Sequence, residues 1–333
     1  MNAFTVSSLP KIDSNLEYKD SLDSSAINPQ RSHQEEKAFQ LKLILSFAAV
    51  YIIWGSTYLA IHYAVETIPP LLQSSFRFIC GGIILFIWAT IQRAPMPSLN
   101  EWLGAGGIGF LLLFCGNGSV SIAEKTVPSG LVALIVSISP VWVVAIDWFK
   151  TKSVPKIVTF LGLFLGCLGI YLLCQPLLSV SQANFKTQGI AIMLLIFATL
   201  TWSLGSVYSK SITQPKNPAM SSAAQMLCAG VLLFVFAFVK GDWASFKASE
   251  VTLQSWLGLS YLIVFGSLIA YTAYTWLVKN AKPSHVVTYA YVNPIVAVFL
   301  GWLIAGEGVT PQTVIAGTCC VASVVLMSLD KNK

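Results

Sequence analysis

Beyond residue 40 the chain alternates long apolar runs with short polar links. Each run is about 20 residues long, enough to cross a hydrocarbon core of roughly 30 Å, and none has the charged face of a soluble amphipathic helix. The links carry the prolines and glycines that end helices. The pattern predicts an all-α membrane protein. Its ten transmembrane helices are expected at residues 41–64, 70–92, 102–123, 128–148, 157–174, 188–209, 218–239, 254–277, 283–304 and 311–329.

Residues 1–38 differ from everything that follows. They are polar, with six acidic residues before Lys37 and no apolar stretch of the kind found in a signal peptide. Such a segment cannot bury enough apolar surface to order itself. We therefore expect a disordered cytoplasmic tail, with the first span acting as the targeting signal.

Composition and charge support the membrane assignment. Hydrophobic residues make up 55% of the chain and charged residues only 10%, where a soluble domain carries about a quarter. The formal charge of +6 comes from lysines in the links and does not indicate nucleic-acid binding. With the amino terminus inside, fifteen Lys and Arg residues fall in inner segments and four in outer ones. This asymmetry places both termini in the cytoplasm.

The two halves of the chain repeat each other. Trp54 to Tyr58 (Trp-Gly-Ser-Thr-Tyr) is echoed 148 residues later by Trp202 to Tyr208, and Pro140 is echoed 154 residues later by Pro294. Because five spans repeat as five, the second half must lie upside down in the membrane. Inverted repeats are typical of transporters, whose substrate site lies near the midplane between the halves. The predicted boundaries are 39–178 for the first repeat and 185–330 for the second.

The two tryptophans are candidates for that site. By helical rise Trp54 lies about 20 Å from the inner end of its span, and Trp202 lies a similar distance from the outer end of the sixth. Both indoles then lie just past the midplane of the bilayer, on opposite sides of it. With Ser56 and Tyr58 they would line a cavity of mixed apolar and hydrogen-bonding character. The alternative is that Gly55 and the nearby serines only permit close helix packing.

Pro140 and Pro294 lie near the middle of the fourth and ninth spans. A proline frees the carbonyl four residues earlier, and lipid cannot satisfy that carbonyl. A neighbouring helix, water or a ligand must do so. We predict that both prolines are hinges and that Tyr289 and Asn293 beside the second one bind substrate. Kinks that serve packing alone are the alternative.

Arg77 is the one charge placed well inside a span, roughly two turns from its outer end. Such a charge is costly and is usually functional or paired. It is predicted to bind the carboxylate of a substrate or to close the outer entrance by pairing with Glu66 or Glu307. Bonds to backbone carbonyls of neighbouring helices would be the structural alternative.

Several kinds of chemistry are missing. No Asp or Glu falls near a predicted midplane, and Glu124 is assigned to a link, so neutral or zwitterionic substrates fit better than cations exchanged for protons. The seven cysteines have no metal-ligand spacing. No catalytic, metal, phosphate or ATP motif is present. We expect no enzyme activity, no metal site and no cofactor.

Several stretches resemble a known family. They are Tyr51 to Ile61, the Pro69-Pro70 turn with Arg77-Phe78, Ser137 to Pro140, Tyr291 to Pro294, and Gly306-Glu307. The chain resembles the EamA-type carriers of the drug/metabolite transporter superfamily over nearly everything after residue 40. The resemblance implies ten helices as two inverted five-helix halves around a central cavity. It also implies export of amino acids or related metabolites, or uptake of small solutes, and it fixes no ligand residue.

The sequence therefore predicts a secondary transporter of a bacterial inner membrane that exports a small metabolite, such as an amino acid, by alternating access. A membrane-embedded ligand sensor or scaffold without flux is the alternative. The expected partners are a small-molecule substrate and the lipid bilayer, with no nucleic acid, and the chain is expected to act as a monomer.

Overall fold

The computed structural model describes residues 33–152, 157–174, 182–281, 283–286 and 288–329. Within these ranges the regular elements are all helical, and no strand occurs. The chain divides into a short unit, residues 1–42, and a main unit, residues 43–333. Most of the predicted tail, residues 1–32, lies outside the described residues. The described chain is already helical at residue 33, so the last six residues of the predicted tail, 33–38, are helical.

Over the described residues, ten helical rods correspond to the ten predicted spans. In order they are α1, η1 and α2 (His33–Ala48, Ala49–Ile53, Trp54–Thr67); α3 (Pro70–Ile91); α4, η2 and α5 (Leu99–Gly109, Phe110–Asn117, Gly118–Ala123); α6 and α7 (Ser129–Val136, Ser139–Thr151); α8 (Ile157–Cys174); α9 (Gln182–Tyr208); α10 (Pro218–Lys240); α12, η5 and α13 (Leu253–Tyr261, Leu262–Tyr271, Thr272–Asn280); α14 and α15 (Pro283–Val286, Tyr289–Ala305); and α16 (Pro311–Leu329). Two short helices, α11 (Asp242–Ser245) and η4 (Ala248–Glu250), lie in the link after α10.

The rods have the dimensions of membrane spans. Over their described residues the first four and the sixth to eighth are long and apolar enough to cross a bilayer. The fifth and ninth contain shorter apolar stretches, Ile157–Gly169 and Val292–Ala305, and the tenth has 19 residues. Their ends follow local chemistry, since the Asn217 side chain accepts from the first backbone N–H groups of α10.

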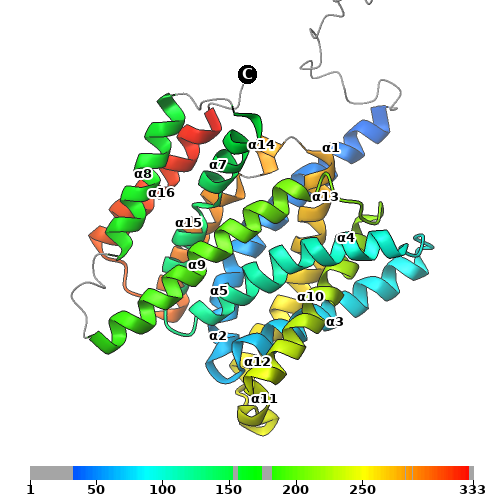
Figure 1. Cartoon of the computed structure of the whole chain (residues 1–333), viewed down its shortest axis with the longest axis horizontal. Coiled ribbons are helices and arrows are strands. Elements are labelled where there is room, and N and C mark those ends of the chain that lie inside the picture. The colour runs from blue at the N-terminus through cyan, green and yellow to red at the C-terminus, as the bar shows by residue number, and fades with distance from the viewer. Residues whose placement is uncertain (1–32, 153–156, 175–181, 282, 287, 330–333) are drawn as a thin grey trace, which may run out of the picture. The chain divides into compact units, whose positions relative to one another are not determined.

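Equivalent rods of the two halves lie side by side. The second rod, α3, packs against the seventh, α10, and the fifth, α8, against the tenth, α16 (Figure 1). At the first crossing a Cβ on Gly82 would lie 2.9 Å from Leu227 Cγ, and one on Gly230 would lie 2.8 Å from Ile79 Cγ1. Both glycines, and both of the residues they meet, are 148 residues apart. The contact is therefore made twice, once by each half.

The first and sixth rods also pack against rods of the other half. The first rod, through α2, packs against α12 and α15 of the second half, and the sixth rod, α9, packs against η2, α5 and α7 of the first half. Each half thus completes its packing only with the other. The region where these rods meet encloses the candidate site.

The two interior prolines behave differently. In the fourth rod α6 ends at Val136, α7 begins at Ser139, and the freed Val136 carbonyl accepts a hydrogen bond from Ser139 Oγ at 2.6 Å. Pro294, in contrast, lies inside α15 without ending it. The symmetric break expected at both prolines is therefore found only at Pro140. Since α15 begins at Tyr289, Pro294 removes a bond only from its first turns, which a helix tolerates better than a loss in mid-course.

Candidate substrate cavity

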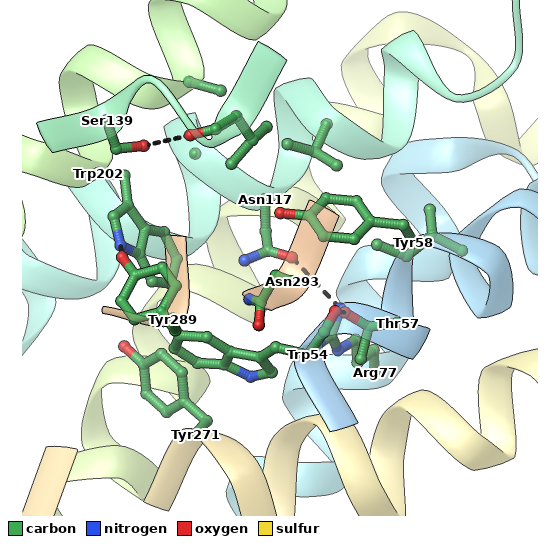
Figure 2. Close-up of a pocket in the computed structure, with 15 residues that line it drawn as sticks. Trp54, Thr57, Tyr58, Arg77, Asn117, Ser139, Trp202, Tyr271, Tyr289 and Asn293 are labelled. Atoms are coloured by element: carbon green, nitrogen blue, oxygen red, sulfur yellow. Dashed lines mark hydrogen bonds between the residues drawn. The ribbon is translucent and has the colours of Figure 1, made fainter. Parts of the chain in front are cut away.

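A cavity of about 70 Å³ lies where rods from both halves meet (Figure 2). Its wall combines aromatic rings, two amides, hydroxyl groups and one guanidinium. The lining residues are Trp54, Thr57, Tyr58, Ile61, Arg77, Gly116, Asn117, Val120, Val136, Ser139, Ala198, Trp202, Tyr271, Tyr289 and Asn293. An apolar wall with a few convergent polar groups is the usual character of a small-molecule site.

Aromatic rings form one side of the cavity. The ring of Trp54 meets that of Trp202 edge to face, with centroids 5.5 Å apart, and that of Tyr289 in the same way at 5.5 Å. Tyr274 lies behind them, 4.9 Å from Trp54 and 5.8 Å from Trp202. These separations are those of favourable aromatic pairs. The rings therefore support each other instead of packing only against aliphatic side chains.

Hydrogen bonds at the ring edges fix this group. Trp202 Nε1 donates to the Tyr289 hydroxyl at 3.0 Å. The Tyr271 hydroxyl donates to Gln225 Oε1 at 2.5 Å, and the hydroxyls of Tyr274 and Ser206 are 2.8 Å apart. Because their polar atoms have protein partners, these rings can offer their faces to a ligand.

Three π-helical segments end beside the cavity. The segment η1 ends directly before Trp54, η2 ends at Asn117 and η5 ends at Tyr271. A π-helical turn holds an extra residue, which re-aims the side chains that follow, and such turns are frequent at functional sites. Asn117 and Tyr271 are 154 residues apart, the spacing that separates Pro140 from Pro294. Both repeats thus use the same device in their third rods.

Arg77 of α3 supplies the positive charge of the cavity and is only 4% exposed. Its Nε donates to Ser267 Oγ at 3.0 Å and its Nη1 to Asn117 Oδ1 at 3.2 Å. A Cβ at Gly266 would lie 2.9 Å from Nη2, so a glycine there makes room for the guanidinium. Among the described residues Arg77 is in no ion pair, and its two partners are neutral.

The expected pairing of Arg77 with Glu66 or Glu307 is not formed. Glu307 instead binds the start of α6. Its Oε1 accepts from the backbone N–H and the hydroxyl of Ser129, both at 2.7 Å, and its Oε2 accepts from the Gly130 N–H at 3.0 Å. A carboxylate at a helix amino terminus satisfies free N–H groups and complements the helix dipole. The geometry explains why Glu307 is unavailable to Arg77.

Asn293 is held by the backbone of two rods. Its amide nitrogen is assigned toward the carbonyl oxygens of Tyr289, at 3.3 Å, and Tyr51, at 3.0 Å, because the opposite orientation would direct its oxygen only at acceptors. The amide oxygen is then left to accept from other groups. Asn293 lines the cavity and is 4% exposed.

Six of the seven residues predicted to bind substrate line this cavity: Trp54, Tyr58, Arg77, Trp202, Tyr289 and Asn293. Ser56 does not. Its hydroxyl donates to the Ile53 carbonyl at 2.7 Å and lies 2.6 Å from the Tyr261 hydroxyl. Being two residues from Trp54 on a helix, Ser56 faces a different direction. Of the two predicted hinges, neither lines the cavity, although the lining residues Ser139 and Asn293 directly precede them.

Sequence reasoning missed Asn117 and Tyr271. Asn117 is the single asparagine of the third apolar run, so a polar amide at that depth was a usable signal. The sequence gives no such signal for Tyr271, because tyrosine is frequent in membrane proteins and often lies at the membrane interface.

Comparison with known proteins agrees with this architecture. A model of the EamA-like transporter family matches residues 41–175 and again residues 189–329. The chain belongs to the EamA-like transporter family. Its two matched segments fall on the two sets of five rods, so the expectation of an all-α membrane protein built from two five-helix repeats is confirmed.

Named relatives are transporters as well. The chain is 36% identical over 295 residues to the uncharacterized inner membrane transporter YedA of Escherichia coli (strain K12), covering 87% of this chain and 92% of YedA. It is 25% identical to the uncharacterized transporter YoaV of Bacillus subtilis (strain 168), covering 84% and 95%. One solved crystal structure aligns with a TM-score of 0.62 at 18% identity over 87% of this chain and 97% of that one, a likeness of fold alone.

This EamA-like protein is thus a multi-pass inner-membrane transporter of a small molecule and not an enzyme.

Proposed function

We propose that this EamA-like protein is a secondary transporter of small zwitterionic metabolites such as amino acids. The observation that carries the proposal is that Arg77 is buried in the cavity wall and has only neutral hydrogen-bond partners. Its guanidinium lines the cavity, is almost fully buried and is bound only by neutral Ser267 and Asn117. A buried cation that no carboxylate contacts by a hydrogen bond supports the proposal of a site for a substrate carboxylate, because such a partner would offset the cost of burying the charge.

The rest of the substrate would lie against the aromatic rings. The faces of Trp54 and Trp202 suit an apolar side chain, and an ammonium group near an indole face gains cation–π attraction. The Asn293 amide oxygen can accept from the same ammonium group. A carboxylate site, an ammonium site and an apolar wall together match an amino acid.

Transport requires the cavity to open to each side in turn. A cavity of about 70 Å³ is smaller than the 300 to 1,000 Å³ of ordinary ligand pockets. A substrate therefore needs the rings contributed by the two halves to separate. We propose that the halves rock about the site, with Pro140 and Pro294 as hinges and with both termini on the cytoplasmic side.

The geometry of the cavity does not determine whether the substrate moves into or out of the cell. A carrier of this kind moves its substrate down the combined gradients of substrate and any coupled ion, so the export expected from the resemblance is an outcome to be measured.

Counterflow in proteoliposomes tests the proposal. Vesicles loaded with an unlabelled mixture of the common amino acids are diluted into the same mixture carrying radiolabel. We expect transient accumulation of label by the wild type and its loss in Trp54→Ala and Asn293→Ala. The matched control is Trp88→Ala, since Trp88 is 51% exposed on α3 and lies outside the cavity.

The alternative of a ligand sensor has a different signature. A sensor would bind an amino acid, measured as a thermal shift of the purified protein, and give no counterflow. Neither binding nor counterflow across the mixture would contradict the proposed substrate class.

A further inference from the structure

Glu124 is a buried acid that the cavity does not use. It directly follows α5, and its backbone N–H donates to the Val120 carbonyl at 3.0 Å. Its side chain is 1% exposed, and among the described residues neither carboxyl oxygen has a hydrogen-bond partner. A carboxylate that is buried and not paired with any protein group is strongly disfavoured, whereas the protonated acid is not. The position therefore favours a bound proton.

The carboxyl lies one helical turn beyond the cavity, because Val120, four residues earlier on the same face, lines it. The charged and titratable groups that face Glu124 are Tyr58 and His62 of α2, Arg77 of α3 and Glu307 after α15.

Two side chains near this end of α5, those of His62 and Gln73, have a buried polar atom without a hydrogen-bond partner among the described residues. His62 Nδ1 is buried and has no hydrogen-bond partner within the described part of the chain. Gln73 of α3 reaches the same end of α5, with its Oε1 accepting from Ser121 Oγ at 3.3 Å, while its Nε2 has no partner among the described residues. Unpaired buried polar atoms are rare in folded proteins and call for an explanation. A site that gains and loses a proton during the transport cycle explains them.

We propose that Glu124 is the proton-binding group of this transporter, and that its proton is linked through the charge of Arg77 to the substrate carboxylate in the cavity. This inference rests on the proposed function. The proton enters one carboxylate oxygen of Glu124 to form an O–H bond and leaves from the same group, and no bond of the substrate changes.

The sign of the linkage follows from the charges. With the cavity empty, the positive charge of Arg77 favours the ionised form of Glu124. A substrate carboxylate on Arg77 offsets that charge, so the proton affinity of Glu124 rises. By reciprocity a proton on Glu124 raises the affinity for substrate by the same factor. Substrate and one proton are carried together, and an acidic medium outside the vesicle or cell drives the substrate inward.

Infrared difference spectroscopy tests the proton site without any substrate. The purified protein is titrated, and the C=O stretch of a protonated carboxylic acid is followed with pH. We expect a protonated carboxyl band that is absent in Glu124→Gln and retained in Glu66→Gln, whose acid is exposed at the end of α2. An unchanged band in Glu124→Gln overturns the proposal. Glutamine matches the shape of protonated glutamic acid, so the variant is expected to fold.

Flux measurements test the linkage. Proteoliposomes that are alkaline inside are diluted into acidic medium containing the radiolabelled amino-acid mixture. With one proton per substrate, a gradient of about one pH unit supports up to about tenfold accumulation. We expect the wild type and Glu66→Gln to approach this limit. Glu124→Gln should keep counterflow at the acidic pH and at the alkaline pH when both sides of the membrane have the same pH. It should lose the accumulation of label that the pH gradient drives.

Two results separate the possible failures. Accumulation by Glu124→Gln equal to that of the wild type overturns the linkage while leaving transport intact. Absence of counterflow in the wild type contradicts the proposed function, and the infrared titration then still decides whether Glu124 holds the proton.

Discussion

Trp54 and Trp202, which occupy equivalent positions of the two repeats, meet edge to face with ring centroids 5.5 Å apart. The two halves therefore touch through the same residue type at the wall of the cavity. Any opening of the cavity between the halves must separate these rings or move them as a pair.

Removal of either indole should weaken substrate binding. In Trp202→Ala the Tyr289 hydroxyl also loses the indole N–H at 3.0 Å, whereas Trp202→Phe keeps a smaller aromatic face and loses that bond with the pyrrole ring. We expect Trp202→Ala to abolish counterflow. Trp202→Phe should retain it with about a tenfold or smaller loss of affinity, because one neutral hydrogen bond contributes about 0.5–1.5 kcal/mol. Equal loss in both variants would show that the bond to Tyr289, and not the ring, matters most.

Arg77→Lys separates charge from geometry. Lysine keeps a positive charge but cannot reproduce the fixed fork that reaches Ser267 and Asn117. We expect affinity for amino acids to fall about 10- to 100-fold, since a hydrogen bond to a charged group contributes about 1.5–3 kcal/mol. Amino-acid amides, which lack the carboxylate, should be affected less. Competition of unlabelled acids and amides against labelled counterflow measures the difference.

The crossing of α3 and α10 should be sensitive to a single methyl group. A Cβ at Gly230 would lie 2.9 Å from the backbone nitrogen of Ile79, which cannot move freely. We expect Gly230→Ala to lower the free energy of unfolding by about 1–3 kcal/mol, the usual cost of overpacking. Gly107→Ala is the control, because no atom beyond the neighbouring backbone of its own helix lies within 4 Å of that Cβ. It should be neutral or stabilising by about 0.5–1 kcal/mol through helix propensity. Thermal unfolding in detergent compares the two.

Glu307→Gln tests the contact that joins the end of the ninth rod to the start of the fourth. Glutamine retains one acceptor for Ser129, but its amide NH2 group faces the Gly130 N–H as a second donor. We expect a lower unfolding temperature and reduced counterflow, since the amino terminus of α6 loses a charged acceptor. The exposed Glu66→Gln should leave both unchanged. A Glu307→Gln protein as stable as the wild type would mean that the three bonds contribute little.

Stability should depend on pH through Glu124, which lies in the turn after the third rod. Burial raises the pKa of its carboxyl, and the negative charge of Glu307 acts in the same direction. The folded protein then binds more protons than the unfolded one between the two pKa values, so the contribution of Glu124 to stability falls as pH rises through the folded pKa. We expect the unfolding temperature of Glu124→Gln to match the wild type at acidic pH and to exceed it at alkaline pH. A constant difference at all pH values would contradict this.

The sequence determined the number of rods and their approximate ends. Length and apolarity are local properties, and a run without a charged face has few alternatives to a membrane helix. The echo of Trp54 in Trp202 also showed the repeat, because equivalent positions keep similar residues at a constant spacing. Depth along a helix follows from residue count, which is why Trp54, Trp202 and Asn293 could be placed near one level.

Only the tertiary structure decided which faces of the rods point inward. Ser56 and Tyr58 are two residues apart, and the rotation of α2 about its axis directs Tyr58 into the cavity and Ser56 toward Tyr261. Counting alone could not show that Glu307 binds α6, that Arg77 is left to neutral partners, or that Glu124 at the end of a span is buried. Each of these depends on contacts between residues far apart in the chain, and therefore on how the two halves pack against each other.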